Sequence, residues 1–500
     1  MKINSICIVG GGTAGWMSAA TFSRIFPEKL ITLVESPSIA TIGVGESTTQ
    51  FFRKWLNFID LDDSWMEECD ATYKYSVRFE NFNEKDPFHY PFISPAGPER
   101  DPISWFIHKA LTPNLPVSNY AEWYAPQMKA VNEGRIPTLS FDRFDVKKDT
   151  GFHFDAVKFA KWLKENICQN VNYIKANVID ANLDDYGNLK NLYLDNNSCL
   201  EADLFVDCTG FRSYLINDIM KTPWETFDDM LPNDSAWTVR LPYTDKKTQM
   251  NTYTNCTALR NGWVWNVPLR NRIGTGYNYS SKFTSDEAAL EEFKHHLGYP
   301  KEILCEYKNI KFKTGISKKP WNKNVLAIGL SGGFIEPLES NGLLSVHEWL
   351  IYACQIIGDN AIRALDINAF NFTTTREFKS FSYFVYYHYA LSTRTDSPYW
   401  KYMTEQYDGL KDLHEDYLYK TRKATTPLNK LEYEKFSYAN YGGETFIAAG
   451  HGWNPFNSVT LRLLETENVI DKSSYIHLED YSKYDDLINT FPFAYEYYAS

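Results

Sequence analysis

A glycine-rich turn near the start of the chain has the spacing of a phosphate-binding loop. Gly10, Gly12 and Gly15 follow an apolar run, 3–9, that predicts a buried strand, and they precede a helical pattern. A second apolar run ends at Glu35. In such a strand–turn–helix–strand unit, glycines let a pyrophosphate approach the backbone, the helix N-terminus faces the phosphates, and the acid binds the ribose hydroxyls. We therefore predict a dinucleotide site here.

Two later segments distinguish a flavin from a nicotinamide dinucleotide. Residues 202–207 predict a strand that ends at Asp207 and is followed by Gly210, and residues 325–329 predict another strand that ends in glycines. Two-domain FAD oxidoreductases bring a late strand back to the flavin in this way, whereas nicotinamide dehydrogenases need no such return. The chain has no second glycine fingerprint, so we predict FAD that is reduced by a separate protein.

Lys74 is a candidate reactive amine. It lies in a segment, 72–79, in which aromatic or aliphatic residues alternate with polar ones, and this alternation predicts a half-buried strand. The pattern alone favours a solvated lysine on the polar face. If the amine instead lies in a pocket, desolvation lowers its proton affinity and makes it a nucleophile or donor.

Glu339 stands directly before Ser340, Asn341, Gly342 and a helical pattern at 343–351. Ser340 or Asn341 suits the N-cap of that helix, and the free backbone N–H groups of Asn341 and Gly342 would form an anion site. The simplest alternative is that Glu339 is an ordinary acid paired with the helix dipole.

Trp263 and Trp265 flank a valine and are followed by Pro268. On a strand, both indoles point to the same face and build a flat aromatic wall. Taken alone, the pair is more simply explained as two core tryptophans beside a proline that ends a strand. Next to a dinucleotide site, we interpret it as a wall that screens the cofactor from a neighbouring ligand.

Composition excludes several functions. The 500 residues are 44% hydrophobic and 23% charged, with a net charge of -12, which argues against sequence-independent nucleic-acid binding. No apolar run reaches the roughly 18 residues of a membrane span. The first strand leaves no room for a signal peptide, and the cysteines form neither a zinc site nor a disulfide pattern, so no metal and a cytoplasmic location are expected.

These elements predict an α/β fold with a doubly wound, Rossmann-like FAD-binding core of the glutathione-reductase or hydroxylase type, an added mixed sheet and a mostly helical C-terminal cap. We expect an FAD and catalytic module at 1–345 and a substrate-site cap at 346–500. The cap is rich in aromatic residues between Phe381 and Tyr402, most of which would simply pack it. Residues 481–500 are expected to form a loosely docked terminus.

In these motifs the chain resembles flavin-dependent halogenases of the tryptophan-halogenase family. The Trp-x-Trp-x-x-Pro and Glu-Pro-Leu-Glu-Ser segments are highly specific, whereas many flavoproteins share the glycine fingerprint. The matching segments lie in order at 10–16, 42–48, 71–79, 152–156, 203–212, 262–268, 333–342, His388-Tyr and Tyr399-Trp400, with a late similarity at Trp453-Asn-Pro455.

The resemblance implies a reaction. Reduced FAD and oxygen oxidise a halide to hypohalous acid, which passes through an internal tunnel to the lysine matched by Lys74. With the glutamate matched by Glu339, this lysine directs halogenation of an electron-rich, indole-type aromatic ring. The carboxylate accepts the ring proton or stabilises the positive ring intermediate; Glu336 is a weaker candidate for that role. The tryptophan wall keeps the substrate off the flavin.

The resemblance also implies further site residues and partners. Halide (chloride, bromide or iodide) is expected at Asn341 and Gly342, and a separate flavin reductase supplies reduced FAD. The partners are a small aromatic substrate, with no nucleic acid and no membrane; a homo-oligomer is left open. The expected FAD contacts are Gly10, Gly12, Thr13, Ala14, Gly15, Glu35, Ser36, Gly45, Glu46, Ser47, Leu330 and Leu343.

The chain departs from the family pattern at two positions. Many members have threonine in place of Asn341 and alanine in place of Ser47. We hypothesise that Asn341 shifts the halide preference toward bromide or iodide. Two other functions stay open: an aromatic hydroxylase on the same fold, which needs no Lys74, and a catalytically silent protein that binds a flavin or an aromatic ligand.

Overall fold

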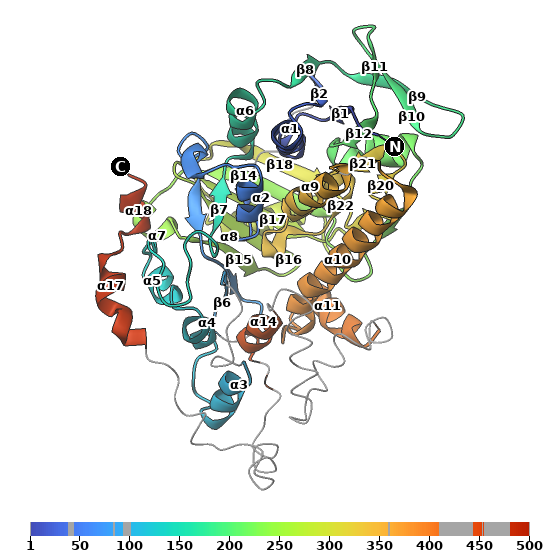
Figure 1. Cartoon of the computed structure of the whole chain (residues 1–500). Helices are drawn as coiled ribbons and strands as arrows, with labels where there is room; N and C mark the ends of the chain where they lie inside the picture. Colours follow the sequence, from blue (N-terminus) through green and yellow to red (C-terminus); the bar gives the residue numbers. More distant parts are fainter. Residues whose placement is uncertain are drawn as a thin grey trace, which may run out of the picture.

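The structure is a computed structural model that describes residues 2–38, 45–83, 86–93, 102–358, 361–409, 444–452, 454 and 481–499. Residues 42–44, Trp453 and Pro455, which contribute to the family resemblance, lie outside the described residues. Figure 1 shows a nucleotide-binding sheet at the top, a large mixed sheet at the centre and long helices of the C-terminal part beside both.

The nucleotide-binding sheet has the order β20-β21-β12-β1-β2-β8 and is parallel except for β20. Its central strands are buried on both faces, which explains their continuous apolar sequence. The predicted early strands, glycine turn and late return strand are confirmed. The strands are β1 Ser5–Val9, β2 Leu30–Glu35, β8 Asn172–Lys175, β12 Leu204–Asp207, β20 Trp321–Asn322 and β21 Val325–Ala327.

Different elements cover the two faces of this sheet. On one face, α1 (Thr13–Ile25) packs against α6 (Ala156–Asn166) and α9 (Leu344–Ile357). On the other face, Leu192 and Leu194 of a three-stranded antiparallel sheet pack into a separate apolar cluster with the strands. That small sheet consists of β9 Val178–Leu183, β10 Leu189–Leu194 and β11 Cys199–Glu201.

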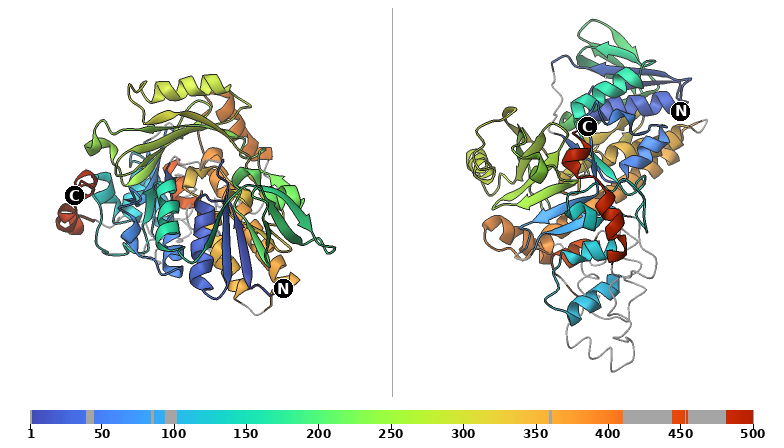
Figure 2. Two further views of the ribbon diagram at one scale, coloured as in Figure 1. Left: turned by 90° about the horizontal axis from the view of Figure 1, so that it is seen from above. Right: turned by 90° about the vertical axis from the view of Figure 1, so that its left-hand side faces the viewer.

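The central sheet has seven strands in the order β18-β14-β17-β16-β15-β5-β6. Its pairs are antiparallel except for β5 with β15, so the predicted mixed sheet is confirmed. Helix α8 (Asp286–His296) lies over its outer face (Figure 2, left). The strands are β5 Ser76–Glu80, β6 Phe88–Pro91, β14 Ser235–Leu241, β15 Tyr253–Ala258, β16 Gly262–Pro268, β17 Ile273–Tyr279 and β18 Cys305–Lys311.

A small sheet of order β3-β7-β4 joins the two large sheets. It consists of β3 (Glu46–Ser47), β7 (Gly151–Phe154) and β4 (Thr72–Lys74). The prediction of one half-buried strand over 72–79 is wrong in two respects. The segment divides at Tyr75, whose N–H bonds the Thr252 carbonyl 2.8 Å away, and its polar face is buried as well. The chain passes here from one sheet into another, so both faces are covered.

The described part of the C-terminal region is helical, as predicted. Helix α10 (Ala364–Ala390) is long and packs against α9, α11 (Pro398–Gly409) and α14 (Glu444–Gly450). Its second half carries a dense buried aromatic face, which faces the central sheet through Phe384, Tyr389 and their neighbours. The division of the chain at 345 into two domains stays a prediction.

The expectation of a loosely docked C-terminus is wrong. Ile136 N–H donates to the Pro492 carbonyl and Ala494 N–H to the Gly134 carbonyl, each over 2.9 Å. The Tyr498 hydroxyl accepts from the backbone N–H of Tyr73 at 2.7 Å. Phe491 and Tyr498 are buried, although Tyr497 is exposed, and through Tyr498 this segment packs against the strand that carries Lys74.

The remaining elements are shorter. They are α2 Phe52–Phe58, α3 Pro102–Leu111, α4 Asn119–Tyr124, α5 Met128–Asn132, α7 Lys246–Gln249, α17 Asp485–Thr490, α18 Ala494–Tyr497, β13 Trp224–Thr226, β19 Gly315–Ser317, β22 Gly333–Phe334, and the helical turns η1 Asp63–Trp65, η3 Gly210–Arg212, η4 Tyr214–Ile219, η5 Gly329–Ser331, η6 Pro337–Glu339 and η8 Tyr481–Tyr484.

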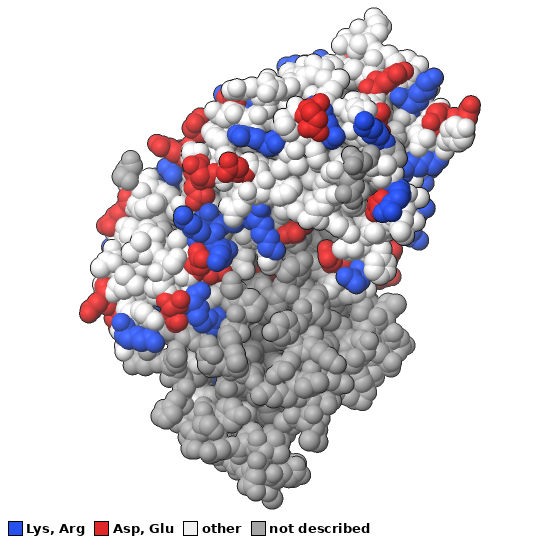
Figure 3. Space-filling view, in the orientation of Figure 1, with Lys and Arg blue, Asp and Glu red and all other residues white. Residues whose placement is uncertain are grey.

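The surface of the described residues carries mixed charge. On the face shown in Figure 3, Lys and Arg side chains lie among Asp and Glu side chains rather than in a basic stripe. Among the helices of the described segments, none is both long and apolar enough to span a membrane.

Candidate active site

The glycine turn is shaped to admit a phosphate. Gly10 has a φ of +123°, and a Cβ there would lie 2.1 Å from the Cys208 carbonyl oxygen. A Cβ at Gly15 would lie 1.8 Å from the Gly10 carbonyl oxygen, whereas a Cβ at Gly12 would meet nothing within 4 Å. Helix α1 begins at Thr13 with no side-chain cap and no acid in its first turn. The turn is closely packed at Gly10 and Gly15 and open at Gly12, so the pyrophosphate of FAD can approach the backbone there.

The expected adenosine contacts follow β2. Glu35 lies against Gly11, and one carboxylate oxygen accepts from the Tyr173 hydroxyl at 2.8 Å. The hydroxyl of Ser36 donates to Asn177 Oδ1 at 2.7 Å. The carboxylate of Glu35 therefore ends at the glycine turn, and its contact with the ribose stays a prediction.

The late strand returns to the start of α1. In η5, a Cβ at Gly329 would lie 3.0 Å from Ala14 Cβ, so Leu330 is held beside the glycine turn. Asp207, at the end of β12, accepts hydrogen bonds from the backbone N–H groups of Thr209 and Ile216. Asp207 therefore shapes the loop after its strand.

Three of the expected flavin contacts lie at strand β3, next to the predicted catalytic residues. Gly45 precedes it, and Glu46 and Ser47 form it. Glu46 is half-buried as a residue, and burial of its carboxyl group, with the nearby charge of Asp155, raises its pKa to about 7. A Cβ at Gly342 would lie 3.6 Å from Glu46 Oε2, so this acid stands next to the expected halide position.

Lys74 is completely buried, so the solvated-lysine alternative is wrong. Its Nζ donates to the Thr48 carbonyl at 3.1 Å and to Ser340 Oγ, and it lies 4.8 Å from the centroid of the Phe92 ring. Burial lowers the pKa of Lys74 to about 7, although the charge of Glu339 opposes the shift. Near neutral pH the amine is therefore divided between its protonated and neutral forms.

Glu339 lies at the end of η6, next to the serine that holds Lys74. It is buried, and burial raises its pKa, while His388 and then Lys74 lower it. Glu339 Oε1 is 2.5 Å from Nε2 of His388 on α10. The structure thus brings the two predicted catalytic residues together, and it adds a histidine to which the sequence analysis assigned no role.

A chain of hydroxyl groups, buried except for the half-buried Ser47, runs from Lys74 toward β7. The Ser47 hydroxyl donates to Ser340 Oγ at 3.0 Å and lies 2.7 Å from Thr254 Oγ1. Thr254 Oγ1 is in turn 2.9 Å from Nε2 of His153, whose pKa burial holds well below its usual value. Ser47, the departure from the family pattern, therefore joins the flavin-side strand to the serine that contacts Lys74.

The helix after Glu339 starts later than predicted. Its N-cap is Leu343, not Ser340 or Asn341. Ser340 has left-handed backbone geometry and its hydroxyl accepts from Lys74, while Asn341 Nδ2 donates to the Ile335 carbonyl at 3.1 Å. The Ser340 hydroxyl is therefore engaged by Lys74 and the Asn341 side-chain N–H₂ group by Ile335, while Asn341 Oδ1 is buried and has no hydrogen-bond partner among the described residues. Among the described residues, no acceptor is found for the backbone N–H groups of Asn341 and Gly342, so the anion site stays a prediction.

The tryptophan pair lies on β16 as predicted, with both indoles on one face. Their ring centroids are 5.8 Å apart, but the planes are inclined by 57°, so the expected flat wall is wrong in shape. Trp263 Nε1 donates to Glu336 Oε2 at 2.9 Å. Glu336 also accepts from Asn233, Asn278 and Tyr389, and these donors make it an anchor for Trp263 rather than a second candidate for the role of Glu339.

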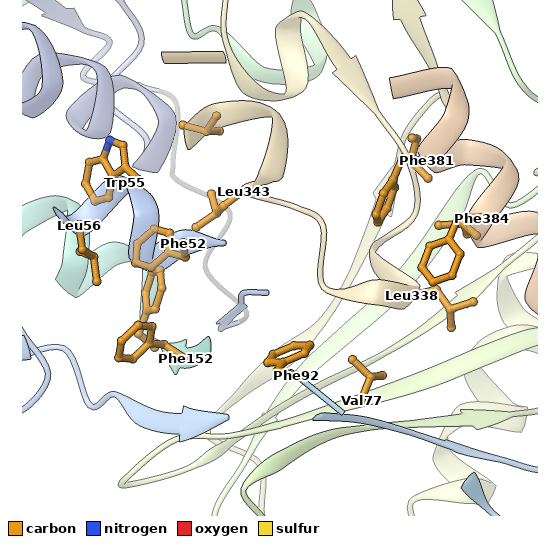
Figure 4. Close-up of a cluster of buried hydrophobic side chains, with 14 of the residues drawn as sticks. Phe52, Trp55, Leu56, Val77, Phe92, Phe152, Leu338, Leu343, Phe381 and Phe384 are labelled. Carbon is orange, nitrogen blue, oxygen red and sulfur yellow. The ribbon is translucent and has the colours of Figure 1, made fainter. Parts of the chain in front are cut away.

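Aromatic side chains line this region from several elements. Figure 4 shows Phe92 between a group around Phe52 and Phe152 and a group formed by Leu338, Phe381 and Phe384. These side chains come from segments that are far apart in the sequence, and no short sequence motif identifies them. The run of aromatic residues in the C-terminal part pointed to Phe384, and His388 stood in a segment that matches the family, without a role of its own.

Comparison with known proteins agrees with this geometry. The family model described as tryptophan halogenase matches residues 5–449. Tryptophan 6-halogenase SttH from Streptomyces toxytricini is 32% identical over 429 residues, which cover 80% of each chain. The solved structure of SttH aligns with 99% of both chains at a TM-score of 0.83. The structure described as apo VirX1 is 35% identical, with a TM-score of 0.89 over 100% of this chain and 99% of that one.

Proposed function

Because the chain belongs to the tryptophan halogenase family, whose enzymes use FAD and halide ions to halogenate aromatic substrates, we propose that it acts through hypohalous acid and Lys74 on an electron-rich, indole-type ring. A separate reductase provides the reduced flavin that such enzymes need. Reduced FAD, when bound, supplies with oxygen the oxidising power that converts halide into hypohalous acid. The chain's own residues then hold and direct that oxidant.

The observation that carries this proposal is the buried amine of Lys74. Desolvation lowers its pKa to about 7, so a large fraction is neutral and nucleophilic at neutral pH. The Thr48 carbonyl and Ser340 Oγ fix its direction. A fixed amine of this kind can take the halogen from hypohalous acid, or donate a hydrogen bond to the acid, and present it to one face of the substrate.

Glu339 is suited to the second half of the reaction. A ring carbon that has gained a halogen must lose its proton to become aromatic again, and a carboxylate beside it accepts that proton. Its negative charge also stabilises the cationic ring. Lys74 donates to Ser340, and Glu339 lies against His388. These contacts hold the amine and the carboxylate in one buried region, which supports both roles of Glu339.

The tryptophan pair supports halogenation over the hydroxylase alternative. A hydroxylase must bring the organic substrate directly to the flavin. Trp263 is completely buried and anchored to Glu336, so it stands as a rigid part of the central sheet. We propose that it separates the flavin from the ring while the small oxidant passes. The same proposal includes the FAD contacts expected from the sequence and a halide site at Asn341 and Gly342.

Mass spectrometry of products tests the proposal. Reactions contain FAD, NADH, a generic flavin reductase, bromide and a panel of indoles and phenols. We expect a product with the bromine isotope pair from the wild type and from Lys311→Ala, an exposed control on β18, but not from Lys74→Ala with intact flavin oxidation. A product heavier by one oxygen, made without bromide and unaffected by Lys74→Ala, would establish the hydroxylase instead. Bound flavin with no product would support the binding protein.

A further inference from the structure

His388 is a buried histidine with no access to water. It is 0% exposed on the aromatic face of α10. The rings of Phe79 and Phe384 enclose it, with centroid distances of 4.8 and 5.3 Å. Its hydrogen-bonding groups must therefore be satisfied by protein atoms.

The two ring nitrogens of His388 face acceptors. Nδ1 lies 3.0 Å from the carbonyl oxygen of Phe384, one helical turn earlier, and a carbonyl only accepts, so Nδ1 carries a proton. A neutral imidazole then has a bare lone pair at Nε2. Because Nε2 is 2.5 Å from Glu339 Oε1, two lone pairs would face each other unless one proton lies between them. The pair therefore holds a shared proton.

The surroundings decide what this proton does. The ionisable groups that act on Glu339 are His388 on α10 and Lys74 on β4; Cys256 on β15 lies near both Glu339 and Glu336, which is on the same loop. Burial raises the pKa of Glu339, and His388 lowers it more than Lys74 does. The thiol of Cys256 has a raised pKa and is neutral, and Glu336 is saturated by its own donors. His388 is therefore the main group that opposes protonation of Glu339.

We propose that His388 is a positioning residue that keeps Glu339 ionised and aims it at the substrate. With the shared proton on Nε2, His388 is a cation that holds Oε1. Among the described residues, no donor contacts Oε2, so that oxygen is left for the ring. In the deprotonation step, the C–H bond at the halogenated ring carbon breaks, its electron pair restores the aromatic ring, and the proton bonds to Oε2. This inference rests on the proposed role of Glu339.

The position of His388 explains why a histidine serves here. An arginine or lysine would bring a permanent charge between two phenylalanine rings, whereas the imidazole packs against them, inclined by 52° to Phe79 and by 75° to Phe384, and gains its charge by sharing the proton of the carboxyl group. The link from Phe384 to Nδ1 fixes the ring orientation, as an outer hydrogen bond fixes a ligating or catalytic histidine in other sites.

The first test of the proposal does not need turnover. In protein labelled with ¹⁵N-histidine, the signals lost in His388→Gln identify His388. We expect both of its nitrogens to be protonated at about pH 7, and Nε2 to lose this state in Glu339→Gln. A bare, unprotonated Nε2 at the same pH would overturn the proposal, because the proton would then reside on Glu339.

The second test separates positioning from packing. The pH profile of bromination is compared for wild type, His388→Phe, His388→Gln and the control His347→Gln, another buried histidine that lies on α9. Losing the cation raises the pKa of Glu339, so in His388→Phe the acid limb of kcat moves to higher pH and kcat falls by about 10-fold or more. His388→Gln keeps a donor and recovers part of the rate.

Two results of the activity test have distinct meanings. An unshifted acid limb in His388→Phe, with only KM changed, would overturn the positioning role. If the wild type gives no brominated product while both nitrogens of His388 are protonated, the proposed function fails and the charged pair stands as a structural finding.

Discussion

The two halves of the site are built in different ways. The flavin half uses backbone groups of one local unit, in which Gly10, Gly12 and Gly15 stand within a single turn. The halogen half uses side chains from β4, the loop after η6 and α10, which are far apart in the chain and meet only when both sheets are packed. A site made of local backbone groups tolerates substitutions in other parts of the chain. A buried site made of side chains depends on each residue that contacts them.

This difference also sets the electrostatics. The flavin half offers uncapped helix N–H groups without a buried cation, which suits a ligand that brings its own charge. The halogen half encloses ionisable groups, Lys74 and Glu339, whose pKa values burial moves in opposite directions, toward the neutral form of each. In the halogen half, the lowered pKa of Lys74, about 7, brings this amine near its titration point at neutral pH. On the flavin side, Glu46 of β3 has a raised pKa of about 7.

Gly15→Ala should have the largest effect, because it breaks the flavin half. The new Cβ would lie 1.8 Å from the Gly10 carbonyl oxygen, so the turn must move and FAD binding should be lost. Flavin fluorescence quenching and the melting temperature measure the two consequences. Gly12→Ala is the matched control: it has room in the free protein, so it should melt like the wild type while FAD binds more weakly. Equal FAD affinity in both variants would contradict the proposal that the glycine turn binds the pyrophosphate of FAD.

Glu339→Gln should break only the halogen half. The amide keeps the shape but cannot accept a ring proton, so we expect halogenation to fall by about 100-fold or more. FAD affinity and NADH-driven oxygen consumption should stay at the wild-type level. Product formation by liquid chromatography, run beside oxygen uptake, checks both. A rate within a few-fold of wild type would show that another group takes the proton.

Ser47→Ala tests the link between the two halves. The change removes the hydrogen bonds of Ser47 with Ser340 and Thr254. Loss of the one to Ser340, worth about 1 kcal/mol, should lower kcat roughly fivefold while FAD affinity changes little. Steady-state kinetics with saturating reduced FAD measure the effect. If Ser47→Ala leaves kcat intact, the hydroxyl chain has no part in holding Lys74.

Asn341→Thr should have the smallest effect, confined to halide choice. If Asn341 favours bromide or iodide, the family threonine should raise the relative turnover of chloride about threefold, a change that corresponds to well under 1 kcal/mol. Side-by-side turnover with the three halides is the measurement. A clear chloride preference in the wild type would remove the hypothesis.

The sequence predicted the flavin half in some detail. The strands around the glycine turn, Glu35 at the end of β2 and the late return at Gly329 all follow from local periodicity and spacing. The same methods placed Lys74 on a solvated strand face, because alternation cannot show that Thr48, Ser340 and Phe92 cover that face. Only resemblance to a family corrected it.

The remaining differences have a local and a long-range cause. Asn341 looked like a helix cap because its type and position suit one, but the helix begins only at Leu344, and the Asn341 side-chain N–H₂ group donates to the Ile335 carbonyl six residues earlier. His388 was visible as part of a motif, yet its role depends on a carboxylate 49 residues earlier in the chain. Nothing in the local sequence sets that distance.

The titration of Lys74 tests the central claim most directly. In protein labelled with ¹³Cε-lysine, the signal absent from Lys74→Met is followed against pH. Burial lowers the pKa of Lys74, so we predict a midpoint near 7, with the amine mostly protonated below it and mostly neutral above it. In the wild type, halogenation through a neutral amine should then rise with pH across the same range. A midpoint near the ordinary lysine value of about 10.4 would contradict the account.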